Sequence, residues 1–281
     1  MPLILGLAAN AFAPSPQFRT GPDLLSNAAT SDYHALQMQV TRRFSQGLQF
    51  QANYTFSKNL DLPFSSGSAS ANSYNNFFNQ SVERSLSGND LRHDFKANAI
   101  WELPFGQGRR FGSGANAWVD GLMGGWQLTT IVSIAGDFPF NVFIDGSART
   151  DFQAGDRPQL LVDRRGGLAD EGTVSRNAQG EVIYWTPDFK DNFGDPLLGT
   201  LGTAPRRWLR GPGYWNVDFA IMKHFNVHEE MQLQFRAEFF NMFNNVNFSN
   251  PDTELSDNDF GRITNENGSP RIIQFALKFT F

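Results

Sequence analysis

The stretch Leu48-Gln-Phe-Gln-Ala-Asn-Tyr-Thr-Phe-Ser57 decides the fold, because apolar and polar side chains alternate through all of it. Successive side chains of a β-strand point to opposite faces, so this stretch predicts a strand with one apolar face. Residues 33–44 alternate in the same way, and the connection at 45–47 contains a glycine. Two alternating runs joined by a short Gly-containing connection predict a β-hairpin.

Pairing within this hairpin follows from the alternation. If Phe44 lies opposite Leu48, the apolar residues meet in the pairs Val40 with Ala52, Met38 with Tyr54 and Leu36 with Phe56. One face of the hairpin is then apolar and the other carries amides and hydroxyls. A soluble sandwich would turn the apolar face toward a second sheet, whereas a membrane barrel would turn it toward lipid. The hairpin alone is compatible with both.

Strand length favours the membrane. Five further alternating stretches lie at 91–103, 126–134, 217–221, 231–239 and 273–281, which makes seven strands in all. A tilted transmembrane strand needs about 9 to 11 residues, and most of the predicted strands are close to that length. Strands in globular sheets are typically shorter, at roughly 5 or 6 residues. No stretch reaches the roughly 18 consecutive apolar residues of a transmembrane helix.

The connections between strands fall into two classes. Short or moderate ones lie at 45–47, 104–124 and 226–230, and they alternate with long ones at 59–88, 143–212 and 245–270. Long loops are rare in compact soluble domains, but outer-membrane barrels place long loops outside and short turns in the periplasm. We therefore predict an all-β fold, an antiparallel transmembrane β-barrel segment of about seven or eight strands whose last strand ends at the periplasmic side.

Two charges and several aromatic rings bear on this prediction. Arg42 and Lys223 fall on the apolar faces of their strands, but near predicted periplasmic ends, where a long side chain can reach water. Aromatic residues at strand ends suit a membrane-interface girdle, with stacking on a ligand as the alternative. They are Tyr54, Phe56, Trp101, Trp126 and Trp215.

Several function classes lack their signals. The net charge of −5 is dispersed, without the basic stripe that nucleic-acid binding requires, and the absence of cysteine excludes disulfides and thiolate chemistry. None of the four histidines forms a metal-ligand pair on a predicted helix or with a cysteine, and the segment Asp257-Asn-Asp259 lacks the ligand spacing of a calcium loop. Since no nucleophile elbow or triad spacing occurs either, we expect no enzyme activity, cofactor or metal.

Charged residues on the polar faces of the last three strands are candidates for contact with a ligand inside the barrel. They are Asp218, Arg236, Glu238 and Lys278, and pairing through the turn at 226–230 would place Arg236 diagonal to Asp218. The alternative is a structural charge ladder, because charges inside a barrel need partners.

The first residues do not fit a strand pattern. Residues 1–13 resemble a short apolar region before a small-residue cleavage site, but they carry no Lys or Arg, which a signal peptide normally has. We therefore expect residues 1–30 to be a lead-in loop or a truncated lead-in, and residues 31–281 to form the barrel part.

Nine segments lie in order along residues 31–281 and carry a family resemblance when taken together. The segments are Ser31-Asp-Tyr-His-Ala-Leu-Gln37, Tyr54-Thr-Phe-Ser-Lys-Asn-Leu-Asp61, Arg92-His-Asp-Phe95, Leu103-Pro-Phe-Gly106, Gly124-Gly-Trp-Gln-Leu128, Leu209-Arg-Gly-Pro-Gly213, Phe235-Arg-Ala-Glu-Phe-Phe-Asn-Met-Phe-Asn244, Phe260-Gly-Arg-Ile263 and Arg271-Ile-Ile-Gln-Phe-Ala-Leu-Lys278. Together they resemble the C-terminal barrel region of TonB-dependent receptors. The resemblance is to the Oar-like branch, in which a carboxypeptidase-regulatory-like domain precedes the plug.

This resemblance implies an outer-membrane receptor that takes up a ligand at its long outer loops. The implied partners are outer-membrane lipid, an extracellular ligand of unknown identity, and TonB acting through a plug that this chain does not contain. Phe279 and Phe281 resemble the terminal signal read by the barrel-assembly machinery. The alternatives are a structural or adhesive outer-membrane barrel fragment without transport activity, and a soluble β-sandwich lectin.

The size of such barrels implies that further strands are needed. Barrels of these receptors have about 22 strands, of which seven are about a third. An open sheet would leave two unpaired edges in lipid, where water cannot satisfy them. We therefore expect the first strand to pair with an upstream strand outside this chain.

Overall fold

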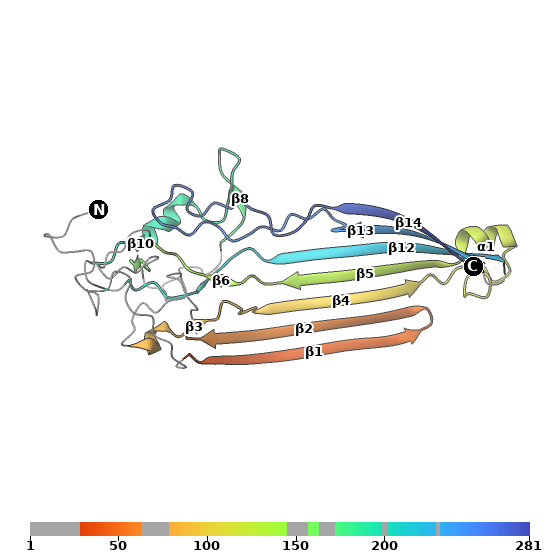
Figure 1. The fold of residues 1–281 in the computed structure, drawn as a ribbon, viewed down its shortest axis with the longest axis horizontal. Coiled ribbons are helices and arrows are strands. Elements are labelled where there is room, and N and C mark those ends of the chain that lie inside the picture. The colour runs from red at the N-terminus through yellow and green to blue at the C-terminus, as the bar shows by residue number, and fades with distance from the viewer. Residues whose placement is uncertain are drawn as a thin grey trace.

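A computed structural model describes residues 29–62, 79–144, 157–162, 172–197, 200, 202–228 and 231–281. Seven long strands form one sheet in chain order, each antiparallel to the next (Figure 1). They are β1 (Ser31–Ser45), β2 (Leu48–Asp61), β4 (His93–Glu102), β5 (Trp126–Ala135), β12 (Tyr214–His228), β13 (Met231–Phe240) and β14 (Ile272–Thr280). All seven predicted strands are present, and β12 is much longer than the predicted 217–221.

Short elements fill the connections. They are η1 (Gln80–Glu83), β3 (Ser85–Leu86), α1 (Ala117–Met123), β6 (Pro139–Phe140), β7 (Gln159–Leu160), β8 (Ser175–Arg176), β9 (Val182–Ile183), η3 (Pro187–Asn192), β10 (Phe193–Gly194) and β11 (Leu209–Arg210). The two-residue strand β3 pairs with the end of β2, and three small sheets form between β6 and β11, β7 and β10, and β8 and β9. Within the described ranges, no helix is both long enough and apolar enough to span a bilayer.

The register of the first hairpin confirms three of the four predicted pairs: Val40 with Ala52, Met38 with Tyr54, and Leu36 with Phe56. The fourth is wrong. Leu48 pairs with Ser45, because a bulge shifts the register between Arg42 and Ser45.

The turn of this hairpin has two residues rather than the predicted three. Gln46 (φ 53°) and Gly47 (φ 80°) both have positive φ, as in the type I′ turns that suit the twist of a hairpin. Gly47 also packs closely on β4, since a Cβ there would lie 2.8 Å from the carbonyl oxygen of Glu102. The tight turn therefore replaces the longer connection that the sequence pattern indicates.

The registers sort side chains into two faces that continue across the sheet. One row of paired positions is apolar and runs Val40, Ala52, Ala97, Val132 and Val217. The neighbouring row points to the other side, is polar, and runs Gln39, Asn53, Lys96, Ser133 and Asn216. We call these the apolar face and the polar face. The apolar face reaches β14, where Phe275 and Leu277 are each 68% exposed, so no protein layer covers it there.

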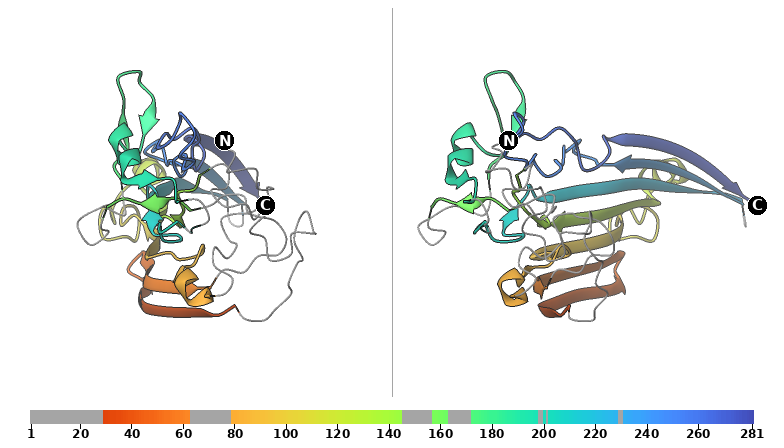
Figure 2. Two further views of the ribbon diagram at one scale, coloured as in Figure 1. Left: turned by 90° about the vertical axis from the view of Figure 1, so that its left-hand side faces the viewer. Right: turned by 60° about the vertical axis from the view of Figure 1, so that its left-hand side comes forward.

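The two ends of the sheet differ as predicted. One, the turn end, carries the connection at 46–47, the connection that contains α1, and the C-terminus, whereas the loop end carries the three long connections (Figure 1). The strands twist strongly and the sheet is open (Figure 2). Its edges are β1 and β14, which pair with β2 and β13 but not with each other in the described part of the chain.

Some sequence-based expectations lie outside the described residues. These include the lead-in over residues 1–28 and parts of the long loops, at 63–78, 145–156, 163–171, 198–199 and 201. The described parts of the long connections are folded together at the loop end. They supply ten of the eleven buried hydrophobic residues found in the described chain, so the main core lies in the loops and not within the sheet.

Candidate functional site: the loop cap

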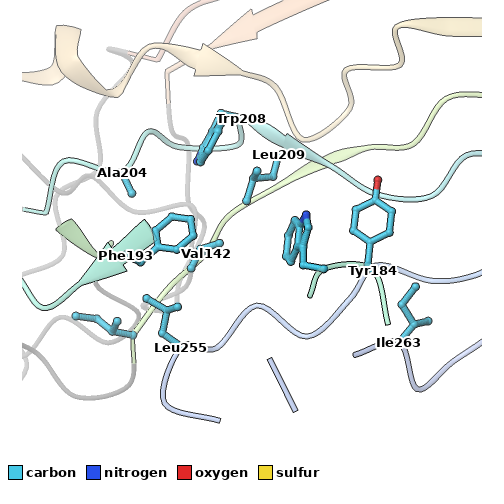
Figure 3. Close-up of a cluster of buried hydrophobic side chains, with 10 residues drawn as sticks. Val142, Tyr184, Phe193, Ala204, Trp208, Leu209, Leu255 and Ile263 are labelled. Carbon is cyan, nitrogen blue, oxygen red and sulfur yellow. The ribbon is translucent and has the colours of Figure 1, made fainter. Parts of the chain in front are cut away.

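We call the described parts of the three long connections, residues 62, 79–92, 136–144, 157–162, 172–197, 200, 202–213 and 241–271, the loop cap. Its core comes from the connection between β5 and β12 and the connection between β13 and β14 (Figure 3). The buried members are Val142, Ile144, Tyr184, Trp185, Phe193, Ala204, Trp208, Leu209, Leu255 and Ile263.

Aromatic rings pack at the centre of this core. The Trp185 ring stacks on Phe189 with a centroid distance of 4.5 Å, and Phe260 lies 5.8 Å from Trp185 on the other connection. Backbone hydrogen bonds join the same two connections, because Tyr184 N donates to Gly261 O at 2.8 Å and Ile263 N to Val182 O at 2.9 Å. The second and third long connections are therefore one folded unit.

The first long connection is attached by buried charges. Three carboxylates at or beyond the end of β2 are almost fully buried: Asp61, Glu83 and Asp90. Each meets an arginine of the second long connection, whose contributing residues are Arg157, Arg206, Arg207 and Arg210. We call these seven residues the buried charge cluster. Removing water from a charge is costly, so such groups persist only when paired and hydrogen-bonded.

Arg206 is the most connected member of this cluster. Its guanidinium pairs with the Asp61 carboxylate and also donates to Asp61 O at 2.8 Å and to Glu83 O at 3.1 Å. Arg207 lies 3.3 Å from the second Asp61 oxygen, and Arg157 lies 2.9 Å from Glu83. One strand end and one loop are thus held by three arginines.

Arg210 makes the other attachment. It pairs with Asp90 and donates through Nη1 to Asp137 O at 3.0 Å, so it joins the first connection to the start of the second. Next to it, Gly211 has no room for a side chain, because a Cβ would collide with the Asp137 carboxylate and the Asn250 amide. The Arg-Gly pair in the segment Leu209-Arg-Gly-Pro-Gly213 is therefore explained by packing where the three connections meet.

Burial shifts two pKa values in the loop cap. The pKa of Asp137 is raised above 3.8, because desolvation outweighs the N–H of Phe138 and the charge of Arg210. The pKa of Arg207 is lowered below its ordinary value, chiefly by desolvation and then by the neighbouring charge of Arg206, against the attraction of Asp61.

A pocket of about 380 Å³ opens where the loop cap meets β12. Tyr184, Trp215 and Phe248 supply aromatic walls. The amides of Asn245 and Asn247 also line it, but both already bind the backbone of β12: Asn247 Oδ1 accepts from Trp215 N at 2.9 Å, and Asn245 Nδ2 donates to Trp215 O at 3.2 Å. Their polar groups therefore orient the strand end.

Of the candidate luminal residues, the structure brings together Arg236 and Glu238, whose side chains approach to 3.4 Å on the same strand. Asp218 instead accepts hydrogen bonds from Asn216 Nδ2 and from Asn241 N, both at 2.9 Å, and so fixes the loop end of β12 and β13. Lys278 lies opposite Gln234 and is exposed. The four residues share the polar face but do not form one site.

The predicted diagonal contact of Arg236 with Asp218 is wrong. β12 continues to His228 and β13 begins at Met231, so the turn is tighter than the predicted 226–230. Pairing therefore moves by two residues, which puts Arg236 opposite Met222.

Lys223 does not reach water as expected. The residue is 2% exposed, its Nζ donates to the Gly124 carbonyl, and it lies 5.3 Å from the Trp126 ring centroid and 5.0 Å from that of Phe225. Arg42 is also near the turn end, and its Nη2 donates to Ser45 O at 3.3 Å. Two charges on the apolar face are thus accommodated by backbone carbonyls, and one of them also by rings.

The histidines and acidic groups lie apart. His93 Nδ1 lies 2.8 Å from the Tyr54 hydroxyl, and the His93 ring packs 5.2 Å from that of Phe56. Asp257 accepts from Asp259 N at 3.1 Å within a turn. In the residues that the structure covers, no three His, Asp or Glu side chains gather in a way that would hold a metal ion.

Sequence reasoning missed the buried charge cluster. Two of its residues, Asp61 and Arg210, lie in segments quoted for the family resemblance, yet nothing in the sequence pairs either with its partner. The partners Asp61 and Arg206 are 145 positions apart, and Asp90 and Arg210 are 120 apart. The only available signal was the presence of charges inside two long connections.

The long antiparallel strands, the uncovered apolar face and the folded loops at one end define an integral outer-membrane β-barrel protein. The sequence matches the model of one family, the outer membrane beta barrel domain, over residues 5–274. The chain belongs to this family, which places it in the bacterial outer membrane. No curated protein and no solved structure matches the chain.

Proposed function

We propose that this chain is the C-terminal barrel part of an Oar-like, TonB-dependent receptor that takes up a ligand across the outer membrane. The observation that carries the proposal is the open sheet beneath a folded loop cap. In lipid, the free edges of β1 and β14 need strand partners, so the seven strands suit a sector of a larger barrel. Barrels of about 22 strands are those that enclose a plug.

The loop cap supports a receptor role. Long outer loops meet the ligand in such a barrel, and here they form a preorganised surface, because a hydrophobic core and the buried charge cluster hold three connections together. A surface that is already ordered loses little conformational entropy when it binds. The polar face supplies a luminal wall, on which Asp94 and Lys96 form an ion pair at 2.9 Å.

The roles within the receptor divide in a simple way. This chain supplies wall, outer surface and the aromatic residues Phe279 and Phe281 of the last strand, which the barrel-assembly machinery would read. Energy input from TonB acts on a plug outside these residues. We propose no catalytic activity, cofactor, metal or nucleic-acid partner for the chain.

The test uses the full-length protein as cells place it in the outer membrane. Two measurements are made on detergent-solubilised outer membranes: retention of the protein on an immobilised TonB C-terminal domain, and a single-particle structure of the purified protein. We expect retention, a plugged barrel of about 22 strands, and β1 paired with a strand outside residues 31–281.

Either of two results would overturn the proposal. One is a closed barrel made of these seven strands alone, with β1 paired to β14. The other is a barrel without a plug that the TonB domain does not retain. The second result would support a structural or adhesive surface protein in place of a transporter.

A further inference from the structure

The connection at the turn end carries the most exposed apolar helix face in the described chain. α1 spans Ala117–Met123, and its apolar side chains are 90% exposed at Trp118, 74% at Leu122, 45% at Met123 and 41% at Val119. Large apolar groups left together at a surface mark an interaction site.

These four residues form one side of the helix. Trp118 with Leu122 and Val119 with Met123 are i, i+4 pairs, which stack as neighbouring ridges on a helix surface. Asp120 lies away from them and accepts the backbone N–H of Gln107, so the polar side of the helix binds its own loop. The helix is therefore amphipathic despite its short length.

Contacts with the sheet show on which side α1 lies. The indole Nε1 of Trp126 donates to Leu122 O at 2.9 Å, and Lys223 Nζ donates to Gly124 O. Trp126 and Lys223 are paired with each other and belong to the apolar face, two residues along from the pair Leu128 with Ile221. The C-terminal end of α1 is thus fixed to side chains of the face that meets lipid in an outer-membrane barrel.

The surroundings of α1 suit the membrane boundary. Trp101 and Phe225, 43% and 38% exposed, lie on the apolar face at the same end of the sheet, where barrels carry an aromatic girdle. The same connection contains Arg109 and Arg110, and the Arg110 guanidinium lies 5.5 Å from the half-exposed ring of Phe111. Cations next to exposed rings are typical of segments that lie among lipid headgroups.

We propose that α1 is an interfacial anchor that inserts Trp118 and Leu122 into the headgroup and acyl boundary of the periplasmic leaflet. The occupant is phospholipid because the C-terminal end of α1 is bonded to Trp126 and Lys223, which belong to the lipid-facing side of the sheet. A helix of seven residues is about 10 Å long, too short to cross the bilayer but long enough to lie along its surface.

The test places a nitroxide label on either side of the helix. This chain contributes no cysteine to the full-length protein, so a cysteine introduced into it is unique within the chain. Leu122→Cys puts the label on the apolar side. Gly121→Cys is the matched control, because a Cβ there meets nothing within 4 Å and lies away from the apolar side. Both labelled proteins are reconstituted into vesicles of phosphatidylethanolamine and phosphatidylglycerol.

The measurement is collision of each label with oxygen, which partitions into lipid, and with a water-soluble nickel chelate. We expect the label at 122 to favour oxygen and the label at 121 to favour nickel. Equal access of nickel to both labels would overturn the proposal by placing α1 in water. Shielding of the label at 122 from both reagents would overturn it in favour of a protein partner.

A second readout keeps the proposal falsifiable if a labelled variant folds poorly. Indole fluorescence of the wild type and of the Trp118→Phe variant is measured in vesicles whose lipid acyl chains carry bromine near the headgroup. Bromine quenches indole fluorescence only on contact. We expect the quenched fraction of the emission to fall in the Phe variant. An unchanged quenched fraction would show that Trp118 does not touch lipid.

Discussion

Replacing Arg206 by Met should release the first long connection from the loop cap. Removal of one partner from a buried ion pair typically costs about 3 to 5 kcal/mol, because the remaining charge stays buried without compensation. Arg206 also donates to Asp61 O and Glu83 O, whereas Asp61 keeps Arg207 at 3.3 Å. That remaining partner places the expected cost near the lower end, ~3 kcal/mol.

Exchange of backbone amide hydrogens measures this free-energy cost in the first long connection itself. A loss of ~3 kcal/mol raises the population of locally open states by about two orders of magnitude. Amides of residues 79–90 should exchange faster by that factor in the reconstituted Arg206→Met protein, whereas amides of β12 and β13 should not change. The partly exposed pair of Arg236 with Glu238 provides the control, since Arg236→Met should cost only about 1 kcal/mol.

Unchanged protection of residues 79–90 in Arg206→Met would refute the reasoning, because the buried charges would then not hold the loop. A double-mutant cycle with Asp61→Asn sharpens the result. If the two residues act through each other, their joint effect should fall short of the sum of the single effects by more than about 0.5 kcal/mol. Additive effects would show that each residue acts through other contacts.

Three further predictions concern single positions. Gly211→Ala should loosen the loop cap, because the added Cβ collides with Asp137 and Asn250. Thermolysin should then cleave the loops faster. Gly114→Ala, where a Cβ meets nothing within 4 Å, should leave the cleavage rate unchanged. Because burial raises the pKa of Asp137, its contribution to stability is complete below 3.8 and is lost as pH rises through the folded-state pKa. Asp137→Asn should therefore melt higher than wild type at pH 7, with the advantage vanishing at low pH; an equal advantage at every pH would contradict this. Gly47→Ala, at φ +80°, should cost about 1 to 2 kcal/mol and lower the heat-modifiable fraction in electrophoresis, and an unchanged fraction would count against the turn assignment.

The strands were predictable because their signal is local. Alternation with period two places Leu48, Phe50 and Ala52 on one face whatever the rest of the chain does. The same alternation predicted the pairs Val40 with Ala52 and Met38 with Tyr54, and the lengths of the connections predicted which end carries the loops. A short turn leaves little choice of register between the two strands that it joins. The pairing of neighbouring strands therefore follows from their order in the sequence.

Small irregularities escaped this reasoning. The bulge after Arg42 moves Leu48 opposite Ser45, and the extension of β12 to His228 moves Arg236 opposite Met222. A bulge or a turn shifts the register of two paired strands by one or two residues. Each strand still alternates between apolar and polar residues, so the alternation in the sequence does not reveal the shift. The predicted contact of Arg236 with Asp218 was therefore wrong, whereas the predicted apolar pairs such as Val40 with Ala52 were right.

The sequence by itself determined the seven-stranded amphipathic sheet, the asymmetry of its ends and the membrane class, since each depends on side-chain periodicity or on length. Only the tertiary structure decided the loop cap. Asp61 and Arg206, 145 positions apart, meet because the strands bring their connections to one end and the core of Trp185, Phe189 and Phe260 fixes them there. The same holds for α1, whose exposed residues acquire a membrane-facing position only through the bonds from Trp126 and Lys223. Contacts between distant segments depend on packing in space, which no local pattern records.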